Sequence, residues 1–373
     1  MKFLLAFDSY KESMSALDAC TAAKQGILEV LPNATCISVP LGDGGEGSMD
    51  ALVSARQGKK IEVKVVDAMG DAIVAKIGVI DEEIAVIEMA QACGLEKITK
   101  VQRNPWIASS YGCGLLFLEA MNQGYRKFIF CLGGSATNDI GIGFLQALGV
   151  VFKNQHNQPI QANMDRWEQL QVMDMEGLDT RLQACTIEIA SDVKNKLLGK
   201  QGATYVFGQQ KGLKKKELKT MEQACRHIAE LLEDSFHQNC KDKSGSGAAG
   251  GLGMALQCLG ASVYEGIEVI AKHTKLEEQM KECNFVFTGE GSVDFQTKYG
   301  KTPIGVAKLA QKYEIPTIVF AGKKKVITKE LEPYGVTAVF SIMQSLTSLE
   351  QALQDGVVNL KETVINVVRL LQQ

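Results

Sequence analysis

The chain has 373 residues, a length that suggests two domains, and its 46% hydrophobic and 22% charged composition is typical of a globular protein with a large core. A formal net charge of −3 excludes the sequence-wide basic field with which proteins bind nucleic acid or anionic lipid. No apolar run approaches the roughly 20 residues of a membrane-spanning helix. We therefore expect no nucleic-acid or membrane partner.

The ten cysteines contain no CxxC pair, and only four histidines accompany them. This pattern favours buried thiols over a zinc site, since structural zinc ligands usually come in closely spaced pairs. The first apolar run, Phe3–Phe7, is too short for the core of a signal peptide. We expect a cytoplasmic protein.

Short apolar runs near both ends of the chain predict parallel strands that are buried on both faces. These runs are Lys2–Phe7, Cys36–Pro40, Asn284–Phe287, Thr317–Phe320 and Ala338–Met343. Between the first two, Ser15 and Asp18 form a capping-box pattern, and apolar residues follow at helical spacing. The residues on this predicted apolar face are Leu17, Cys20, Ile27, Leu28 and Leu31.

The pattern changes in the middle of the chain. Ile61–Val66 and Val74–Ile80 alternate like antiparallel strands, whereas Ile84–Glu88, Phe128–Leu132 and Ile187–Ser191 resemble buried strands. The sequence therefore predicts an α/β protein in which residues 1–60 and 282–373 form a parallel-sheet domain. Residues 61–281 form an inserted α/β domain with a mixed sheet, and we expect the active site in the cleft between the two.

The glycine-rich loop Gly42–Gly47 follows the second predicted strand and contains the carboxylates Asp43 and Glu46. It matches G-x-G-x-x-G, and Asp67 lies about 20 residues further on, so a dinucleotide site is one interpretation. The carboxylates inside the turn would repel a pyrophosphate. A hydroxyl substrate or a magnesium ion suits this loop better.

Two other segments indicate anion binding. Gly133–Asp139 places small residues, hydroxyls and an amide at a predicted helix start, where backbone N–H groups can bind an anion. Lys11 and Ser13 precede the capped first helix, where a cation and a helix N-terminus can together hold phosphate or carboxylate.

Two more loops carry carboxylates. Thr288–Asp294 contains Glu290 and Asp294, and the G-K-T that follows is no P-loop, because Phe295 stands where the first glycine is required. This segment is suited to metal–phosphate contact. Asp192 ends a predicted strand and is a candidate general base. The lysine-rich stretch Lys211–Lys219 is typical of a solvated helix face.

Taken together, these motifs resemble the glycerate kinases of the bacterial type I, or glycerate 2-kinase, group. The resemblance runs nearly end to end. It rests on Asp8–Ala16, Gly42–Gly47, Asn104–Pro105 leading to Tyr111–Gly112, Gly133–Asp139, Gly247–Gly253, and Thr288–Asp294 with Gln296–Thr297. One departure is Ile140, where the family usually has glycine after the aspartate.

The resemblance implies ATP-dependent phosphorylation of D-glycerate, with 2-phospho-D-glycerate favoured over 3-phospho-D-glycerate, and ATP and Mg²⁺ as cofactors. It also implies a flavodoxin-like domain with a restriction-endonuclease-like insertion. The catalytic candidates are Asp192 and Lys11, and the metal candidates are Asp294 and Glu290. The substrate candidates are Asp43, Glu46, Arg103, Asn104 and Ser110, and the nucleotide candidates are Ser13, Gly133, Gly134, Ser135, Asn138, Lys211, Gly289 and Gly291.

Other interpretations stay open at this point. A kinase of another small hydroxy acid, an NAD-dependent oxidoreductase built on Gly42–Gly47, and a binding protein without catalysis all fit part of the pattern. The expected partners are glycerate and ATP. The sequence leaves the oligomeric state open, with a homodimer as one option.

Overall fold

The computed structural model describes residues 1–295, 297 and 301–372, and the chain divides into two compact units. The first unit comprises residues 1–43, 50–57 and 265 onward, and the second comprises residues 44–49 and 58–264. The predicted boundary at residue 282 is therefore too late. Residues 265–281 belong to the first unit because their helices, α9 (Gly266–Thr274) and α10 (Leu276–Met280), contact α11 (Thr302–Gln311).

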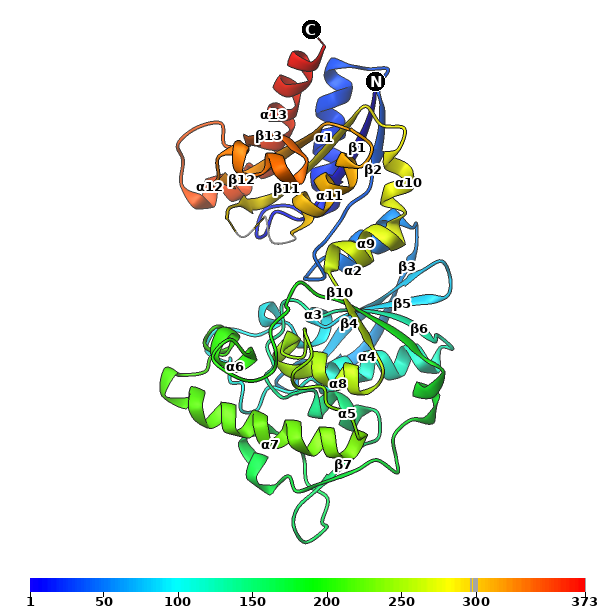
Figure 1. The fold of residues 1–373 in the computed structure, drawn as a ribbon, viewed down its shortest axis with the longest axis vertical. Coiled ribbons are helices and arrows are strands. Elements are labelled where there is room, and N and C mark those ends of the chain that lie inside the picture. The colour runs from blue at the N-terminus through cyan, green and yellow to red at the C-terminus, as the bar shows by residue number, and fades with distance from the viewer. Residues whose placement is uncertain (296, 298–300, 373) are drawn as a thin grey trace. The chain divides into compact units, whose positions relative to one another are not determined.

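The first unit is built on a five-stranded sheet in which every neighbouring pair is parallel (Figure 1). The order is β13-β12-β11-β1-β2, and the strands are β1 (Lys2–Phe7), β2 (Thr35–Ser38), β11 (Phe285–Val293), β12 (Thr317–Lys324) and β13 (Val336–Ser341). All five predicted strands are confirmed. β11 is longer than predicted because Ser292 and Val293 still pair with β12, so the glycines of Thr288–Asp294 lie on a strand instead of in a turn.

Helices cover both faces of this sheet. Alternate residues of a strand point to opposite faces. Ile318 and Phe320 pack in one core with α1 (Ala16–Val30) and α13 (Gly356–Leu371), which lie side by side (Figure 1). Val319 and Ala321 pack in a second core with α11. The remaining helices of this unit are most of α2 (Ser48–Ala55) and α12 (Leu349–Gln354).

The predicted capping box starts α1. The Ser15 hydroxyl accepts a hydrogen bond from the Asp18 N–H at 3.1 Å, and the Asp18 carboxylate accepts one from the Ser15 N–H at 3.2 Å. Cys20 and Ile27 are fully buried as expected. Leu17 is 48% exposed, so the prediction that it belongs to the apolar face is wrong.

The second unit contains a six-stranded mixed sheet in the order β10-β9-β6-β5-β4-β3. β3, β4 and β5 pair antiparallel, and β5, β6, β9 and β10 pair parallel, so the predicted mixed sheet is confirmed. Its strands are β3 (Lys59–Val66), β4 (Ala72–Ile80), β5 (Ile84–Glu88), β6 (Lys127–Cys131), β9 (Thr186–Ala190) and β10 (Ser262–Tyr264). β7 (Val151–Lys153) and β8 (Val172–Asp174) form a separate pair.

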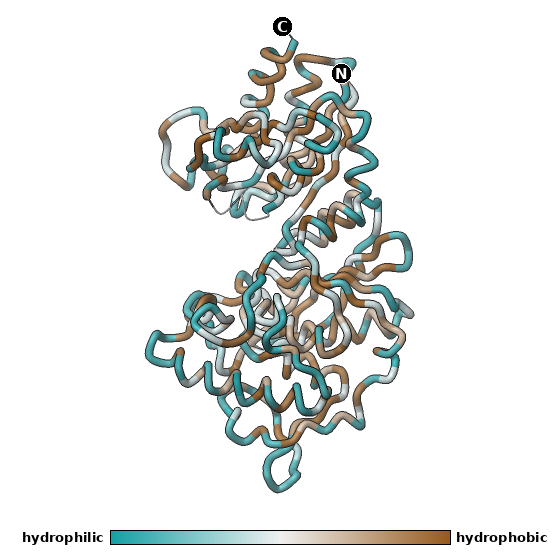
Figure 2. The backbone as a smooth tube through the Cα atoms, viewed as in Figure 1, coloured by the Kyte–Doolittle hydropathy of each residue, from teal (hydrophilic) through white to brown (hydrophobic). Residues whose placement is uncertain are grey.

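Short helices surround this sheet, and α7 is the longest (Figure 1). Hydrophobic and hydrophilic residues alternate along α7 at helical spacing (Figure 2), and its buried side includes Met221, Cys225 and Ile228. The helices are α3 (Ala90–Cys93), α4 (Tyr111–Asn122), α5 (Ile142–Ala147), α6 (Ala203–Phe207), α7 (Leu218–Phe236) and α8 (Leu252–Cys258). Throughout the described ranges, no helix combines the length and apolarity needed to cross a bilayer.

Candidate functional site

The carboxyl ends of β1 and β11 form a topological switch point in the first unit's sheet. β2 lies beyond β1 on one side and β12 beyond β11 on the other, and open α/β sheets bind ligands where the strand order reverses in this way. Asp8 immediately follows β1, and its N–H donates to the Gly289 carbonyl at 3.0 Å. Glu290 is the next residue of β11, so two carboxylates lie at the switch point.

Asp8 is buried, with 8% of its surface exposed. Its carboxylate accepts hydrogen bonds from the Ser9 N–H and from the Thr302 hydroxyl at the start of α11, both at 2.6 Å. Burial, together with the nearby charge of Asp43, raises the pKa of Asp8 to about 8. The sequence analysis did not select Asp8, although a carboxylate that directly ends an apolar strand is a usable signal.

Glu290 is buried beside Asp8 and is paired. One carboxylate oxygen accepts from the Thr297 hydroxyl at 2.9 Å, and the other lies 3.1 Å from the Lys301 ammonium. Burial raises the pKa of Glu290, and Lys301 opposes that shift. The Thr297 hydroxyl also accepts from the Asp294 N–H at 3.1 Å, so Thr297 links the two predicted metal ligands. Gln296, part of the same motif, lies outside the described residues.

The predicted nucleotide-binding glycines of β11 lie against the loop that carries Lys11. A Cβ on Gly289 would come within 2.4 Å of the Tyr10 hydroxyl, which donates to the Phe320 carbonyl at 2.8 Å. Gly291 lies beside the Lys11 backbone nitrogen, and the Lys11 side chain is exposed. The structure therefore brings Lys11, both glycines and Glu290 together at the switch point.

Ser13 points elsewhere. Its hydroxyl donates to the Leu353 carbonyl at 2.6 Å, near the end of α12. A Cβ on Gly356 would come within 2.1 Å of the same hydroxyl. Through these contacts Ser13 connects the loop after β1 to α12 and to the start of α13. We therefore do not retain Ser13 as a nucleotide ligand.

In the second unit, the loop that begins at Gly44 lies across the carboxyl ends of β6 and β9. The Gly133 N–H donates to the Gly44 carbonyl at 3.1 Å, and a Cβ on Gly133 would come within 2.4 Å of the Gly45 Cα. A Cβ on Gly44 would lie 2.4 Å from the Ala190 carbonyl oxygen. Asp192 lies two residues after Ala190 and is half-buried, so it comes close to this loop, in which Glu46 is exposed.

Glu88 fixes the far end of the same loop. It is the last residue of β5, it is fully buried, and its carboxylate accepts the Met49 N–H at 3.0 Å. A buried carboxylate can be accommodated where it accepts backbone donors. The sequence analysis did not select Glu88, because an apolar run that ends in one glutamate is typical of a buried strand whose last residue is exposed to solvent.

The loop Gly133–Asp139 is held by a lysine that comes from far along the chain. Lys211 is 3% exposed, and its side-chain nitrogen donates to the Ser135 hydroxyl at 2.8 Å and to the Thr137 carbonyl at 2.7 Å. The prediction that residue 211 lies on a solvated face is therefore wrong, whereas Lys214–Lys216 and Lys219 are exposed as expected. Burial lowers the pKa of Lys211 to about 7.

The Gly247–Gly253 motif supports this loop from the other side. Ala249, Gly250 and Gly251 all have positive φ, between +51° and +97°. The Ile140 N–H donates to the Gly250 carbonyl at 3.0 Å, and a Cβ on Gly250 would lie 2.1 Å from the Thr137 carbonyl oxygen. The close approach explains why this motif contains so many glycines.

The substrate candidates of the second unit lie in two environments. Arg103 donates to the carbonyls of Gln210 and Leu95, next to Lys211, and its buried Nε has no hydrogen-bond partner among the described residues. The Asn104 side-chain oxygen accepts the Trp106 N–H at 3.2 Å within its own turn.

Ser110, by contrast, is fully buried beneath the loop. Its hydroxyl donates to the Asp139 carboxylate at 2.8 Å and accepts the Phe144 N–H at 2.9 Å. Burial raises the pKa of Asp139, although four donors, from Ser110, Gly141 and Gly143, oppose that shift. Because the Ser110 hydroxyl is fully used in holding Asp139, we do not retain Ser110 as a substrate ligand.

Ile140, which replaces the glycine usual in the resembling family, has φ = +55°. A β-branched residue rarely adopts this left-handed region. Its side chain is fully buried, and burying an isoleucine contributes roughly 1.5–3 kcal/mol. This burial offsets the strain of the left-handed backbone, which costs about 1–2 kcal/mol.

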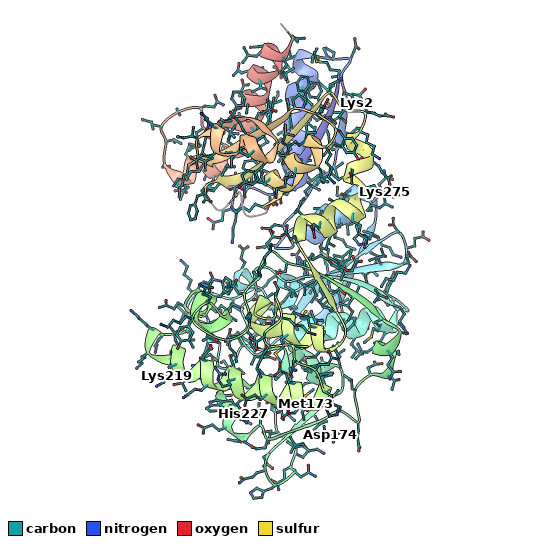
Figure 3. All side chains as sticks on the ribbon, in the orientation of Figure 1. Lys2, Met173, Asp174, Lys219, His227 and Lys275 are labelled. Carbon is teal, nitrogen blue, oxygen red and sulfur yellow. The ribbon has the colours of Figure 1, made fainter. Side chains whose placement is uncertain are left out.

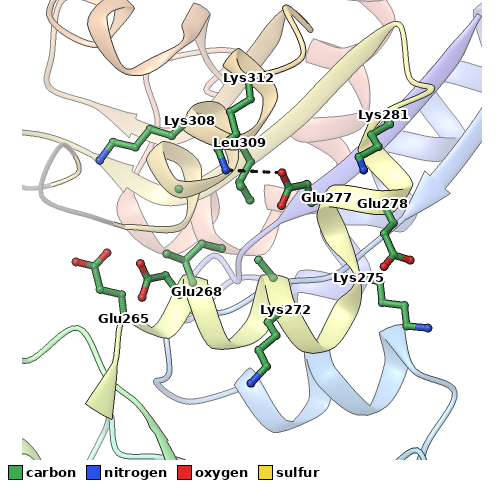
Figure 4. A pocket seen from close by; sticks show the side chains of 13 residues that line it. Glu265, Glu268, Lys272, Lys275, Glu277, Glu278, Lys281, Lys308, Leu309 and Lys312 are labelled. Atoms are coloured by element: carbon green, nitrogen blue, oxygen red, sulfur yellow. Dashed lines mark ion pairs between the residues drawn. The ribbon is translucent and has the colours of Figure 1, made fainter. Parts of the chain in front are cut away.

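A cavity of about 660 Å³ lies elsewhere in the first unit, among α9, α10 and α11 (Figure 4). Lysines and glutamates line it in nearly equal numbers, and Glu277 and Lys312 form an ion pair at 3.6 Å. None of the predicted site residues lines this cavity. Its lining favours neither an anion nor a cation.

Comparison with known proteins decides the family. The model of the glycerate kinase family matches residues 3–372. The chain belongs to the glycerate kinase family. It is 40% identical to a glycerate kinase of Halalkalibacterium halodurans over 98% of this chain and 96% of that protein. It is 39% identical to a glycerate 2-kinase of Escherichia coli over 100% and 98% of the two chains. A solved structure from Salmonella typhimurium LT2, provisionally designated glycerate kinase 2, superposes with a TM-score of 0.89 at 41% identity and covers 100% of this chain and 98% of its own.

Membership of this kinase family makes the chain an enzyme and removes the interpretation as a binding protein without catalysis. The interpretation as a dinucleotide-binding site also needs Asp67 as the acidic residue that binds the ribose. The Asp67 carboxylate accepts the N–H groups of Met69 and Asp71, at 2.8 and 3.0 Å, within the turn that joins β3 to β4. Asp67 therefore shapes a hairpin turn and is not placed to bind a ribose.

For this family member, the substitution Asp8→Asn is expected to change how stability depends on pH. The folded-state pKa of about 8 lies above the unfolded value of about 3.9, so the folded wild type binds the extra proton between these values. Its stability therefore falls as pH rises from about 4 to about 8. The asparagine side chain mimics the protonated acid, so urea denaturation should show similar stability of the two proteins at pH 4 and an advantage for the variant at pH 8. Parallel curves would contradict the raised pKa.

Proposed function

We propose that this enzyme transfers the γ-phosphoryl group of ATP to D-glycerate and forms 2-phospho-D-glycerate in preference to the 3-isomer. The observation that carries the proposal is the full-length similarity to glycerate kinases, including the E. coli protein named glycerate 2-kinase. Phosphoryl transfer needs a positioned hydroxyl, neutralised phosphate oxygens and little covalent chemistry from the protein. The two clusters of residues described above carry groups of these kinds.

The first unit's switch point suits a metal–nucleotide complex. No three acidic, histidine or cysteine side chains in the described ranges could hold a metal unaided. Mg²⁺ typically takes one or two carboxylates and completes its shell with water and phosphate oxygens. The charges of Asp43 and Glu290 both act to raise the pKa of Asp8, and a divalent cation would relieve that repulsion. We propose Glu290 and Asp294 as Mg²⁺ ligands, together with Asp8; the bound ion would neutralise phosphate charge.

Lys11 would contact phosphate oxygens beside Gly289 and Gly291. Gly289 has no space for a side chain, because Phe320 and Tyr10 approach its backbone closely, whereas a Cβ on Gly291 would meet nothing nearer than 3.5 Å. The backbone of Gly133–Ser135 and the Lys211 side chain would offer donors to a second anionic group, whereas the unpaired side-chain oxygen of Asn138, beside them, would accept a hydrogen bond from the ligand.

Asp192 is the proposed general base for the glycerate hydroxyl, with Asp43 and Glu46 as acceptors for substrate hydroxyls. Arg103 and Asn104 would bind the glycerate carboxylate, since a guanidinium suits a carboxylate and the Nε of Arg103 still has a donor to give.

Two broader features accompany the proposal. The first unit's order, 2-1-3-4-5 when its strands are numbered within the unit, supports a flavodoxin-like domain, and we propose a restriction-endonuclease-like second unit. The ten cysteines are all thiols, which supports a reducing cytoplasm as the compartment.

A coupled assay of ADP release with Mg·ATP tests the function. The enzyme should release ADP with D-glycerate far faster than with L-glycerate, lactate or tartronate, and ³¹P NMR should show the new phosphate ester on C2. Faster turnover with another hydroxy acid would reassign the substrate. An ester on C3 would reassign the product while leaving the kinase activity intact.

A further inference from the structure

Lys211 is a buried lysine that has no carboxylate partner in the part of the chain that the structure describes. The two acceptors of its side-chain nitrogen, the Ser135 hydroxyl and the Thr137 carbonyl, are both neutral. Within the described residues, Lys211 forms no ion pair at 4.0 Å or less. A buried ammonium is usually paired, because an isolated charge in a low-dielectric interior is unfavourable.

The charged and titratable groups around Lys211 do not supply that pair. On the loop itself, both Asp139 oxygens are engaged by Ser110, Gly141 and Gly143, and Asp139 acts on Lys211 only at longer range. On α7, burial raises the pKa of Cys225 to about 12, so that group is a neutral thiol. From the loop after α3, Arg103 adds a positive charge and donates a hydrogen bond to the carbonyl of Gln210.

Unfilled hydrogen-bonding capacity surrounds the same loop. The Thr137 hydroxyl and the Asn138 side-chain oxygen are buried without partners among the described residues, as is Arg103 Nε. The Asn138 amide nitrogen is fixed by the Thr204 hydroxyl at 3.2 Å, so its oxygen is held in place. The loop is thus a rigid polar surface that carries one guanidinium and one lysine.

We propose that Lys211 is largely a neutral amine in the empty enzyme at pH 8 and takes up a proton from solvent when an anionic oxygen of a substrate binds at Gly133–Asn138. The ammonium then pairs with the bound carboxylate or phosphate, and no other bond changes. This inference rests on the proposed function and deepens it, since it makes Lys211 a substrate-binding residue that, above pH 7, gains its charge in the complex. The lowered pKa of Lys211, to about 7, agrees with the geometry.

Isothermal titration calorimetry in buffers of different ionisation enthalpy counts the protons taken up. D-glycerate and the Mg²⁺ complex of a non-hydrolysable ATP analogue are titrated separately, so the experiment shows which of them supplies the anion. For a resting pKa of about 7, one of the two should take up about 0.9 proton at pH 8 and about 0.1 proton at pH 6. Its affinity should fall with rising pH above 7.

Three variants sharpen the test. Lys211→Met should abolish the uptake and weaken that ligand by about 10- to 100-fold, the loss of one charge-assisted hydrogen bond. Lys211→Arg, which is always charged, should bind without proton uptake and keeps the test valid if the methionine variant folds poorly. Lys219→Met, on the exposed side of α7 (Figure 3), should behave as wild type.

Binding of both ligands to the wild type at pH 8 without proton uptake would overturn this inference and leave the kinase proposal standing. Uptake that persists in Lys211→Met would overturn it as well. Failure of both ligands to bind the folded wild type would remove the proposed function, and this inference with it.

Discussion

Replacing Asp192 with asparagine is expected to lower kcat by about 10²- to 10⁴-fold, which is the usual contribution of a general base. Asp192 follows the last residues of β9, where the Ser191 hydroxyl accepts the Val193 N–H at 3.2 Å and fixes the turn. The neighbouring carbonyl of Ala190 contacts the loop at Gly44. A side chain at this position is therefore held by a rigid scaffold. Asparagine keeps its size and removes its basicity.

The measurement is steady-state kinetics with each substrate varied in turn. The KM for ATP should change little, because a base acts on the glycerate hydroxyl and not on the nucleotide. Asp242→Asn is the matched control, since Asp242 is exposed and pairs only with Lys196, at 3.3 Å, among the residues described. Near-normal turnover of the Asp192 variant would remove this residue from the base role.

Gly44→Ala should destabilise the second unit by about 2–5 kcal/mol and abolish most of the activity. Two effects add at this position. Gly44 has φ = +82°, where an L-residue costs about 1–2 kcal/mol, and the new Cβ would lie 2.4 Å from the Ala190 carbonyl oxygen. Overpacking against a backbone atom that cannot move aside costs about 1–3 kcal/mol more. The substitution therefore strains the contact between the loop at Gly44 and the end of β9.

Gly47→Ala separates the two effects. Gly47 belongs to the same loop and has φ = +87°, but a Cβ there would meet nothing within 4 Å. Its alanine variant should lose only the backbone part, about 1–2 kcal/mol. Urea denaturation of both variants gives the comparison. Equal losses of stability in the two variants would show that the close approach of residue 44 to the Ala190 carbonyl does not contribute to the destabilisation.

The sheets were predictable from sequence because their strands are short, apolar and bounded by polar residues. Lys2–Phe7 was predicted with its observed bounds, and the antiparallel hairpin of β3 and β4 was recognised from its alternation. β10 was not predicted because Ser262–Tyr264 is three residues long and only partly buried, so it has no apolar run. The extension of β11 escaped because Gly289 and Gly291 look like turn residues. Only the pairing with β12 reveals them as strand.

The site was partly predictable for a different reason. Loops at strand ends can be recognised locally, and the structure does place Lys11 beside Gly291 and Gly133 beside Gly44. Burial of a charged residue depends on partners far along the chain. Lys211 lies in a lysine-rich stretch whose other lysines are exposed, and its acceptors at positions 135 and 137 come from another segment. No local pattern carries that information.

The first unit's sheet also sets an order of events during synthesis. Phe3 in β1 pairs with Phe285 in β11, so the N-terminal strand leaves the ribosome long before its central partner exists. At 5–20 residues per second, the wait is roughly 15–60 s. The second unit is complete by residue 264 and can fold during that interval. During that interval only β2 and α1 can cover the apolar residues Phe3–Phe7, so the edge of β1 that later pairs with β11 stays unpaired.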